Sequence, residues 1–404
     1  MLARLARPWM AGSCFFLAFG LASGQTGPQA VISLTGTGEL PAGSIENNEL
    51  VLLDSSGGSR CFLNDQTLAF YLGDLNGDGL FDLPGNLDAL ELVPQSIGSP
   101  LTAGMHFSLV SDQAGLLDGD VLRFDPDLAG VGVYVVYSEA LLVGAVDAND
   151  GNIDVDGIAF QPDGSLLFSL AEDESTGPNQ LVVEDDAVWK LPAGSTTASV
   201  LYSAAEIDLL VENALGQAVS IGDVKALEWE QGELLFTVQS PSSDDATIFS
   251  SAGGGSVWNG LAESSFGFTN AVEADALALY SGAPLPLADL DPPRAQEGDP
   301  VQVLLSGLTP GQPYLLVAAY APIKGGSGLS LNGFGVLAMD QTDPLFLLGL
   351  RNAPALMGVA DPAGQGIYLD VAPVRGGLGY DLVLQAVELP SHSISNPVVL
   401  EVNQ

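Results

Sequence analysis

The densest group of candidate metal ligands is a short stretch of Asp, Asn and Gly between Gly73 and Asp82. Oxygen-bearing residues occupy alternate positions there, and a glycine stands where such a loop must turn sharply. The candidate ligands are the side chains of Asp74, Asn76, Asp78 and Asp82 and the backbone carbonyl of Leu80. This order of oxygens predicts a calcium site. The alternative is a solvated turn, because Asp, Asn and Gly are also the residues that tight turns select.

The run Gly73-Asp-Leu-Asn-Gly-Asp-Gly79 resembles the calcium loops of dockerins and the first three quarters of an EF-hand loop. The resemblance implies calcium as the cofactor. The chain departs from both families at the last ligand position, where Gly85 replaces Glu or Asp. Asn86 or Asp88 would supply the missing ligand from the start of the next strand.

A second loop runs from Asp147 to Asp156 and stands at the equivalent place before a later strand. Its candidate ligands are Asp147, Asn149, Asp154 and Asp156. The order of ligand types is less regular than in the first loop, so the prediction of calcium here rests on the number of oxygen ligands.

These loops lead into a repeated pattern that covers residues 28–282. In each copy an acidic or polar residue is followed by a small residue and an apolar strand. The copies are Asn86–Leu92, Asp154–Phe160, Asp223–Trp229 and Glu273–Leu279. Second strands follow three of them, at Phe107-Ser108-Leu109, Phe168-Ser169-Leu170 and Phe236-Thr237-Val238. Short strands repeated with turns between them predict an all-β array.

The spacing of the copies predicts a small β-propeller of four, or five, four-stranded blades. The last copy lacks following strands, whereas strands near the start, at 50–53 and 68–72, lack an inner strand. Pairing the chain ends within one blade would close the ring and remove free sheet edges. An open stack or sandwich of the same hairpins is the alternative.

One helix is predicted over 204–215, from a capping box at Ser203 and Glu206 and an apolar face.

The segment Asp156–Ser169 contains Pro162-Asp163-Gly164 between two strands. It resembles the Pro-Asp-Gly repeats of NHL-type and gluconolactonase-like β-propellers, in which that turn joins the inner strand to its neighbour. The resemblance implies the propeller fold. Gluconolactonase-like propellers use a central divalent ion to activate water or polarise an ester carbonyl, which implies a metal-dependent hydrolase of lactones or esters as an alternative function.

Matching positions of the copies would lie near the axis of a propeller. Asp88, Asp156 and Asp275 would converge there, with Lys225 as the fourth member. Converging carboxylates bind a hard cation or repel one another, so positive charge is needed among them. A metal ion and the Lys225 ammonium are equally good sources of that charge. Acids further out on the same face are Glu172, Asp173, Glu174, Glu184, Asp185, Asp186, Asp244 and Asp245.

Residues suited to catalysis are scarce in the sequence. The two histidines, His106 and His392, are far apart, and His106 stands where sibling strands have leucine. The sequence has no Gly-x-Ser-x-Gly motif, no phosphate-binding glycine loop with lysine, and no Cys or His cluster for zinc. We therefore assign no catalytic residue and expect a calcium-stabilised binding or surface-structural protein. The alternative is the metal-dependent hydrolase acting at the channel mouth.

The composition narrows the set of partners. The chain has 50 Asp and Glu against 10 Lys and Arg, a formal net charge of -40, and 47% hydrophobic residues. The apolar content predicts a folded chain. The negative field repels phosphate groups, which excludes nucleic acid and acidic membranes as partners. Divalent cations are the expected partners, with a glycan or a cell-surface component as a further one.

Residues 1–24 have the pattern of a cleaved signal peptide. Arg4 and Arg7 precede an apolar run, and Ala22-Ser23-Gly24 offers small residues for cleavage. The apolar run is too short to span a bilayer comfortably. We expect a bacterial protein that is exported to the extracellular space or the cell surface.

The C-terminal third predicts a separate domain. Residues 283–300 are rich in proline and predict a stiff linker. Beyond them, short strands separated by turns predict a β-sandwich over 301–404. The runs 376–387 and 395–399 look similar to C-terminal sandwich modules of large exported proteins of marine environmental bacteria. Little function follows from that resemblance. Surface attachment or glycan contact is one hypothesis for this domain, and a passive stabilising domain is the alternative.

Overall fold

The structure is a computed structural model of the 404-residue chain. The residues that it describes are 29–40, 43–45, 49–55, 59–63, 87–92, 105–113, 115–124, 133–148, 151–176, 181–219, 221–239, 246–280, 287–291, 294–320, 329–331, 335–337, 345, 356–362, 364–371, 380–389, 393–395 and 398–403. The predicted signal peptide and the predicted calcium loop before residue 86 lie outside these ranges.

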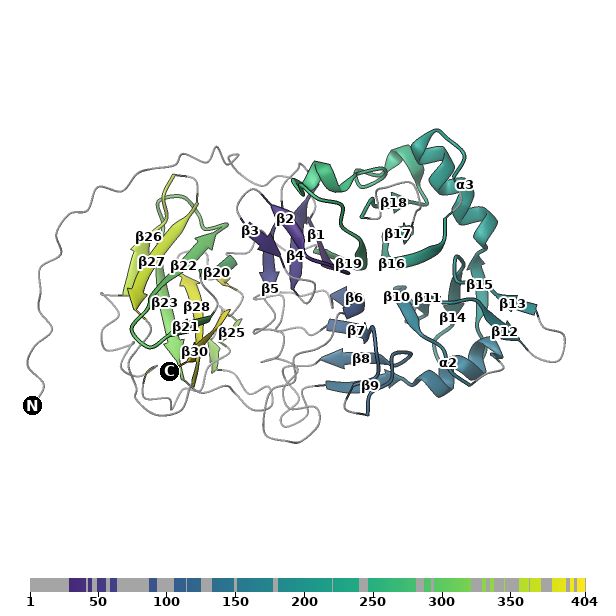
Figure 1. The fold of residues 1–404 in the computed structure, drawn as a ribbon, viewed down its shortest axis with the longest axis horizontal. Coiled ribbons are helices and arrows are strands. Elements are labelled where there is room, and N and C mark those ends of the chain that lie inside the picture. Colours follow the sequence, from purple (N-terminus) through teal and green to yellow (C-terminus); the bar gives the residue numbers. More distant parts are fainter. Residues whose placement is uncertain are drawn as a thin grey trace, which may run out of the picture.

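The N-terminal part is a ring of antiparallel sheets. Among the described residues, four sheets surround one axis, and each innermost strand contacts the innermost strands of its two neighbours (Figure 1). The predicted all-β propeller is thereby confirmed.

Blade 1 consists of β6 (Leu87–Leu92), β7 (Met105–Leu109), β8 (Val121–Phe124) and β9 (Val133–Tyr137). Blade 2 consists of β10 (Val155–Phe160), β11 (Leu166–Leu170), β14 (Val188–Leu191) and β15 (Ser199–Tyr202). Blade 3 consists of β16 (Asp223–Glu230), β17 (Glu233–Gln239) and β18 (Phe249–Ser250). The closing blade consists of β19 (Ala274–Tyr280), β1 (Gln29–Leu34), β4 (Leu50–Asp54) and β5 (Ser59–Leu63).

The closing blade joins the two ends of the repeat region. β19 pairs antiparallel with β1, from Gln29 opposite Tyr280 to Leu34 opposite Ala274. β4 continues the sheet on the other side of β1, and β5 follows β4. This is the closure that the sequence predicts, because it removes a free edge from the first and last strands. Residues 68–72, expected in the same blade, lie outside the described residues.

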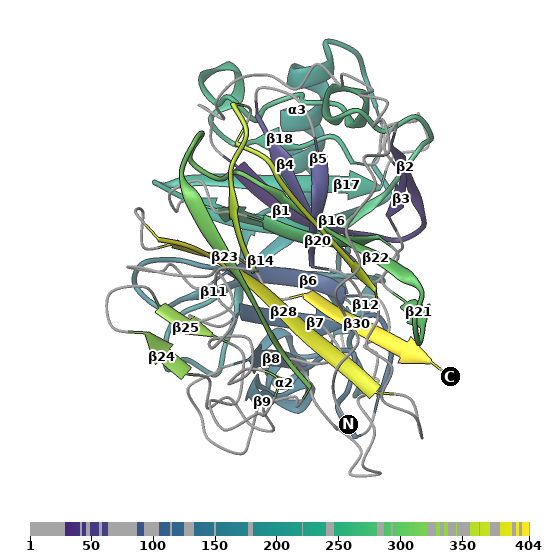
Figure 2. The same cartoon turned by 90° about the vertical axis from the view of Figure 1, so that its left-hand side faces the viewer.

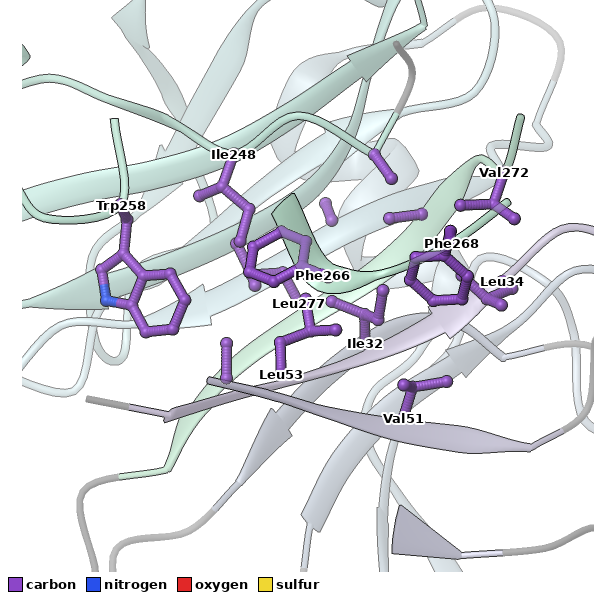
Figure 3. Packing of buried hydrophobic residues seen from close by; sticks show 14 of the residues in the cluster. Ile32, Leu34, Val51, Leu53, Ile248, Trp258, Phe266, Phe268, Val272 and Leu277 are labelled. Atoms are coloured by element: carbon purple, nitrogen blue, oxygen red, sulfur yellow. The ribbon is translucent and has the colours of Figure 1, made fainter. Parts of the chain in front are cut away.

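An apolar core fixes this closure. In Figure 3, side chains from β1 and β4 lie beside side chains from the chain between β18 and β19. Ile32 and Phe266 are each 1% exposed, and Leu53 is fully buried. Fully burying a side chain of this size contributes roughly 1.5–3 kcal/mol. The labelled members of the core are Ile32, Leu34, Val51, Leu53, Ile248, Trp258, Phe266, Phe268, Val272 and Leu277.

Each innermost strand carries a β-bulge at the same repeat position. In the pairing with the second strand, the ladder skips one residue of each innermost strand. The skipped residues, here called the axis ring, are Asp88, Asp156, Lys225 and Asp275. A bulge leaves its extra residue unpaired and re-aims the side chain. Each blade therefore has one ionisable residue outside its ladder of paired residues, at the same position along its innermost strand.

Hydroxyls on the second strands tie these bulges together. The bonds run from Ser33 Oγ to Leu87 O (2.7 Å), from Ser108 Oγ to Val155 O (2.9 Å) and from Thr237 Oγ1 to Ala274 O (3.0 Å). Each accepting carbonyl belongs to the residue just before an axis-ring residue of the next blade, so each bond crosses a blade boundary at a bulge. Ser169, the matching residue of blade 2, differs because its Oγ is buried without a hydrogen-bond partner.

We expect Ser108→Ala to lower the free energy of unfolding by about 1–2 kcal/mol, because the buried Val155 carbonyl loses its donor. Ser169→Ala is the matched control. Both serines are fully buried, but removing a hydroxyl that has no partner should leave stability unchanged or slightly higher. Urea unfolding of the two variants beside the unaltered protein measures the difference. Equal losses would show that the bond across the blade boundary does not stabilise the ring.

Two α-helices occur among the described residues, and both stand between blades. α2 (Glu139–Val146) follows blade 1, and α3 (Ala204–Leu215) follows blade 2. α3 begins with the predicted capping box of Ser203 and Glu206, which confirms that helix. The remaining short elements here are β2 (Gly38–Leu40), β3 (Gly43–Ile45), β12 (Glu174–Thr176), β13 (Leu181–Val183), η2 (Gly253–Gly255) and η3 (Glu263–Phe266).

The C-terminal part confirms the predicted β-sandwich. One sheet has the order β20 (Leu287–Asp291), β22 (Pro300–Ser306) and β27 (Gly366–Val371). The other has the order β21 (Arg294–Gln296), β30 (Val398–Asn403), β28 (Tyr380–Glu388), β23 (Pro313–Ala319) and β26 (Met357–Val359), with β29 (Ser393–Ile394) beside β28. Figure 2 shows β23, β28 and β30 side by side. A separate hairpin joins β24 (Leu329–Leu331) to β25 (Gly335–Leu337).

The stretch 283–300 differs from the predicted linker. It contributes β20, which pairs with β22, and β21, which pairs with β30. The physical reason is tertiary. Ala288 packs into the apolar core of the sandwich, and β22 and β30 supply the hydrogen-bonding partners of the two strands.

Among the described residues, no helix has both the length and the apolar character needed to cross a membrane.

Candidate functional site on the propeller axis

The axis ring gathers ionisable side chains in a buried position. Asp88, Asp156 and Asp275 are 4%, 1% and 3% exposed. Lys225 takes the fourth position, and its side chain is 16% exposed. The bulges of the four innermost strands put these residues together. Because water screens buried charges poorly, the interactions among these side chains decide their protonation.

Lys225 makes two ion pairs within the centre. Its Nζ lies 3.0 Å from Oδ2 of Asp156 and 3.0 Å from Oδ2 of Asp223, which stands two residues earlier on β16. Burial alone would lower the pKa of Lys225, but Asp156 and then Asp223 hold that pKa above its ordinary value. Lys225 is therefore charged, and it supplies the lysine counter-charge that the sequence left open.

One ammonium does not balance the surrounding acids. Burial, followed by the charge of Asp156, raises the pKa of Asp88 well above its ordinary value. Burial and then Asp156 also raise the pKa of Asp223 to about 9, although Lys225 opposes that shift. Asp223 and Asp88 therefore both hold a proton more readily than an ordinary aspartate does. One oxygen of Asp223, Oδ1, is buried without a hydrogen-bond partner.

Two further acids complete the centre. Burial raises the pKa of Asp275 to about 6, against the hydrogen bond that Thr35 Oγ1 donates to Asp275 Oδ1 at 2.5 Å. Burial, and then Asp118 and Asp156, raise the pKa of Asp154 to about 7. The carboxyls around Lys225 are Asp88, Asp154, Asp156, Asp223 and Asp275. Acids with raised pKa values and one cation among them release protons when a further cation binds.

A second layer of acid lies three residues further along the innermost strands. The corresponding residues in chain order are Glu91, Ala159, Glu228 and Ala278. The glutamates of blades 1 and 3, here called the glutamate pair, are 8% and 6% exposed. Each accepts a backbone N–H from the next innermost strand: Phe160 N–H donates to Glu91 Oε2 at 3.4 Å, and Leu279 N–H donates to Glu228 Oε2 at 2.6 Å.

The glutamate pair interacts across the ring. Burial, and then the charge of Glu228, raise the pKa of Glu91 well above its ordinary value. Burial raises the pKa of Glu228 to about 7, although the N–H groups of Leu279 and Trp229 lower it. Glu228 therefore favours the protonated form at mildly acidic pH, and the pKa of Glu91 is shifted in the same direction.

The structure brings together only some of the predicted ligands. Asp88, Asp156 and Asp275 share the axis ring, and Asp154 borders it. Asp147 instead ends α2 as its C-cap, is exposed, and adopts the left-handed conformation (φ 62°). The predicted ligands outside the described residues are Asp74, Asn76, Asp78, Leu80, Asp82 and Asn149.

No group of three or more His, Cys, Asp or Glu side chains in the described part of the chain already has the geometry to hold a metal ion. A cation at the axis would therefore require the carboxylates to turn toward it. The interaction of Asp88, Asp275 and Asp154 with Asp156 shows that these groups are close enough to affect one another's charge.

Sequence reasoning missed Asp223, Glu91 and Glu228 as members of the centre. Their signal was present in the aligned copies. Asp223 occupies the position of Asp154, two residues before the axis ring, and the glutamates recur three residues after it in alternate copies. His106 lies in a packed environment. Its ring centroid is 4.6 Å from that of Phe160, and burial, then Arg123, lower its pKa to about 4.

No family model matches the chain, and no curated protein matches it. Similar solved structures include the extracellular domain of BT4673 from B. thetaiotaomicron, with 9% identity and a TM-score of 0.20 over 91% of this chain and 46% of that chain. Another is the extracellular domain of BT3049 from the same organism, with 8% identity and a TM-score of 0.22 over 92% and 55%. A third is PorZ, a surface component of the type-IX secretion system of Porphyromonas gingivalis, with 9% identity and a TM-score of 0.21 over 93% and 51%. The chain spans about half the length of these structures. They are extracellular or surface parts of bacterial proteins, and at these TM-scores the likeness carries no argument about function.

Proposed function

We propose that the protein is an exported, calcium-stabilised binding or surface-structural protein whose propeller axis attracts divalent cations. The observation that carries this proposal is the surplus of acid around Lys225. Asp88, Asp156, Asp223 and Asp275 are almost fully buried, yet a single ammonium lies among them. A hard cation with oxygen ligands would balance them and displace protons that the raised pKa values retain. The signal-peptide pattern of residues 1–24 supports export.

Calcium is expected to raise the thermal unfolding midpoint of the full chain after chelator treatment. An ion that binds the folded state alone stabilises it by mass action, by about 2.7 kcal/mol at a hundredfold excess over Kd. Sodium chloride at equal ionic strength is the control, because a chain with a net charge of -40 also responds to general screening. A midpoint that calcium and sodium chloride move equally would remove calcium from the proposal.

Two variants separate the two expected positions of the ion. Asp78→Asn removes a ligand of the loop that resembles dockerin loops, and Asp275→Asn removes one from the axis ring. Asp275 is chosen at the axis because Asp156 and Asp223 are the residues whose ion pairs with Lys225 a substitution would break. The variant that loses the calcium response identifies the position that stabilises the fold.

Binding and hydrolysis are separated with a panel of lactones and esters. For a binding protein, neither the unaltered chain nor Asp156→Ala should turn over any of them. Calcium-dependent turnover that Asp156→Ala abolishes would replace the binding proposal with the hydrolase alternative.

A glycan array with the full chain tests the further proposal that the C-terminal sandwich contacts a glycan.

A further inference from the structure

A second acidic cluster lies at the boundary between blades 1 and 2. It draws on the connection between β7 and β8, the first residue of α2, and the residues that lead into β10. Its members are Asp112, Asp118, Asp120, Glu139 and Asp154. Among the described residues, none of these five forms an ion pair with lysine or arginine. Lys225 at the axis lowers the pKa of Asp154, but no ion pair among the described contacts neutralises the other four carboxylates.

Backbone N–H groups orient the carboxylates of this cluster. Glu139 Oε1 accepts the N–H of Ile153 at 3.2 Å, Asp118 Oδ1 accepts that of Gly119 at 3.0 Å, and Asp112 Oδ1 accepts that of Asp118 at 3.2 Å. Each of these three carboxylates is fixed through one oxygen, which leaves the other for a ligand. Both oxygens of Asp120 are occupied, since Oδ1 accepts the N–H of Glu139 at 2.8 Å and Oδ2 that of Leu117 at 3.1 Å.

Glu139 supplies the observation that points to a ligand. The residue is 3% exposed, and its Oε2 is buried without any hydrogen-bond partner. Its side chain packs closely against Gly119. A Cβ added to that glycine would lie 2.5 Å from Glu139 Cγ and 2.2 Å from the carbonyl oxygen of Ile153. Oδ1 of Asp154, the next residue, is also buried without a partner. Leaving a buried oxygen unsatisfied costs about 1–3 kcal/mol, more for a charged group.

We propose that this boundary binds a divalent cation, calcium by its ligand chemistry, through Glu139, Asp154, Asp118 and Asp112. Because no three of these carboxylates are already arranged to hold an ion, binding requires them to turn toward it. Asp120 positions Glu139 and the Asp118 turn without contacting the ion. The ligands are all oxygens and come from loops and a helix start, which suits the flexible coordination of calcium better than the strict octahedron of magnesium. Burial and the neighbouring acids raise the pKa values of Glu139 and Asp118, as expected for carboxylates without a counter-ion.

The boundary between blades 2 and 3 offers a matched comparison within the same molecule. Asp173 Oδ1 accepts the N–H of Asp185 at 3.1 Å, as Asp112 does for Asp118. Asp208 Oδ1 on α3 accepts the N–H of Ile221 at 3.4 Å, as Glu139 does for Ile153. No oxygen of Asp173, Asp185 or Asp208 is buried without a partner, however. The second boundary repeats the scaffold without the unsatisfied oxygens.

Calorimetric titration of calcium chloride into the chelator-treated full chain tests the site. Glu139→Gln keeps the oxygen that accepts the Ile153 N–H but removes the charge. We expect it to remove one ion from the stoichiometry, or to weaken one site by about tenfold or more. Asp208→Asn is the control and should bind calcium as the unaltered chain does. Magnesium chloride in the same titration should bind more weakly than calcium.

Asp118→Asn keeps the test decisive if Glu139→Gln does not fold, because Asp118 is partly exposed and its loss should spare the fold. Unchanged stoichiometry and affinity in both variants, or an equal loss in Asp208→Asn, would overturn the proposal. The inference goes beyond the proposed function and fails separately from it. A calcium-raised midpoint with unaltered binding in Glu139→Gln rejects this site alone, whereas loss of one ion without any midpoint effect of calcium rejects the stabilising role alone.

Discussion

Replacing Lys225 with methionine is expected to lower the free energy of unfolding by about 3–5 kcal/mol at pH 7, the range for breaking a buried ion pair. The reason is that Asp156, which is 1% exposed, loses its charged partner at 3.0 Å and stays among other acids. Denaturant unfolding measures the loss. Methionine keeps most of the side-chain length, so the change removes charge rather than volume.

Lys190→Met is the matched control for this prediction. Lys190 lies 3.6 Å from Asp163, whose side chain is 63% exposed, and solvent screening leaves such a surface pair with little effect on stability. Adding Asp156→Asn to Lys225→Met should recover part of the loss, since both members of the buried pair are then absent. A Lys225→Met variant no less stable than Lys190→Met would refute the view that Lys225 neutralises the axis ring.

Stability is expected to fall as the pH rises from 4 to 8, opposite to the trend of most proteins that lose stability in acid. Burial raises the pKa of Glu228 to about 7, whereas the ordinary value is 4.5. Between these values the unfolded chain ionises and the folded chain keeps its proton, so raising the pH favours unfolding. The shift of Glu228 alone corresponds to on the order of 3 kcal/mol, complete above its folded-state pKa. The raised pKa values of Glu91, Asp88, Asp223 and Asp275 act in the same direction.

Glu91→Gln isolates the contribution of the glutamate pair. The amide keeps an oxygen for the Phe160 N–H and removes the group whose ionisation opposes folding. The variant should match the unaltered protein at pH 4 and exceed it in stability at pH 8. Urea unfolding across this range, with chelator present to exclude bound cations, makes the comparison. Parallel pH profiles of the two proteins would contradict the assignment.

The inner strands and the axis ring could be predicted from the sequence because several local signals coincide there. Asp156 is followed by Gly157 and an apolar strand, and the same order recurs around Asp88 and Asp275. A repeat of this kind fixes equivalent positions without any knowledge of contacts. The helix over 204–215 was equally accessible, since Ser203 and Glu206 mark its start.

Other elements lacked a local signal. α2, with the sequence Glu139-Ala-Leu-Leu-Val-Gly-Ala-Val146, is apolar on nearly all sides, so it shows no helical periodicity. The prolines near β20 indicated a linker, and only the partner strand β22 reveals that the segment is paired. Burial of Glu91 and Glu228 follows from four strands meeting at one axis, which is a tertiary fact. Within a single strand a glutamate reads as a solvent-facing residue.

The closing blade also determines when the acidic centre comes into existence. Because Gln29 pairs with Tyr280, the ring cannot close until nearly all of the repeat region is available. Before that moment Asp88, Asp156 and Asp275 belong to strands that have not met, and pairing across so many residues is a slow event in folding. If the exported chain crosses the membrane before it folds, its carboxylates are spread along an unfolded polypeptide. The centre would then be assembled only at the destination, from the cations available there.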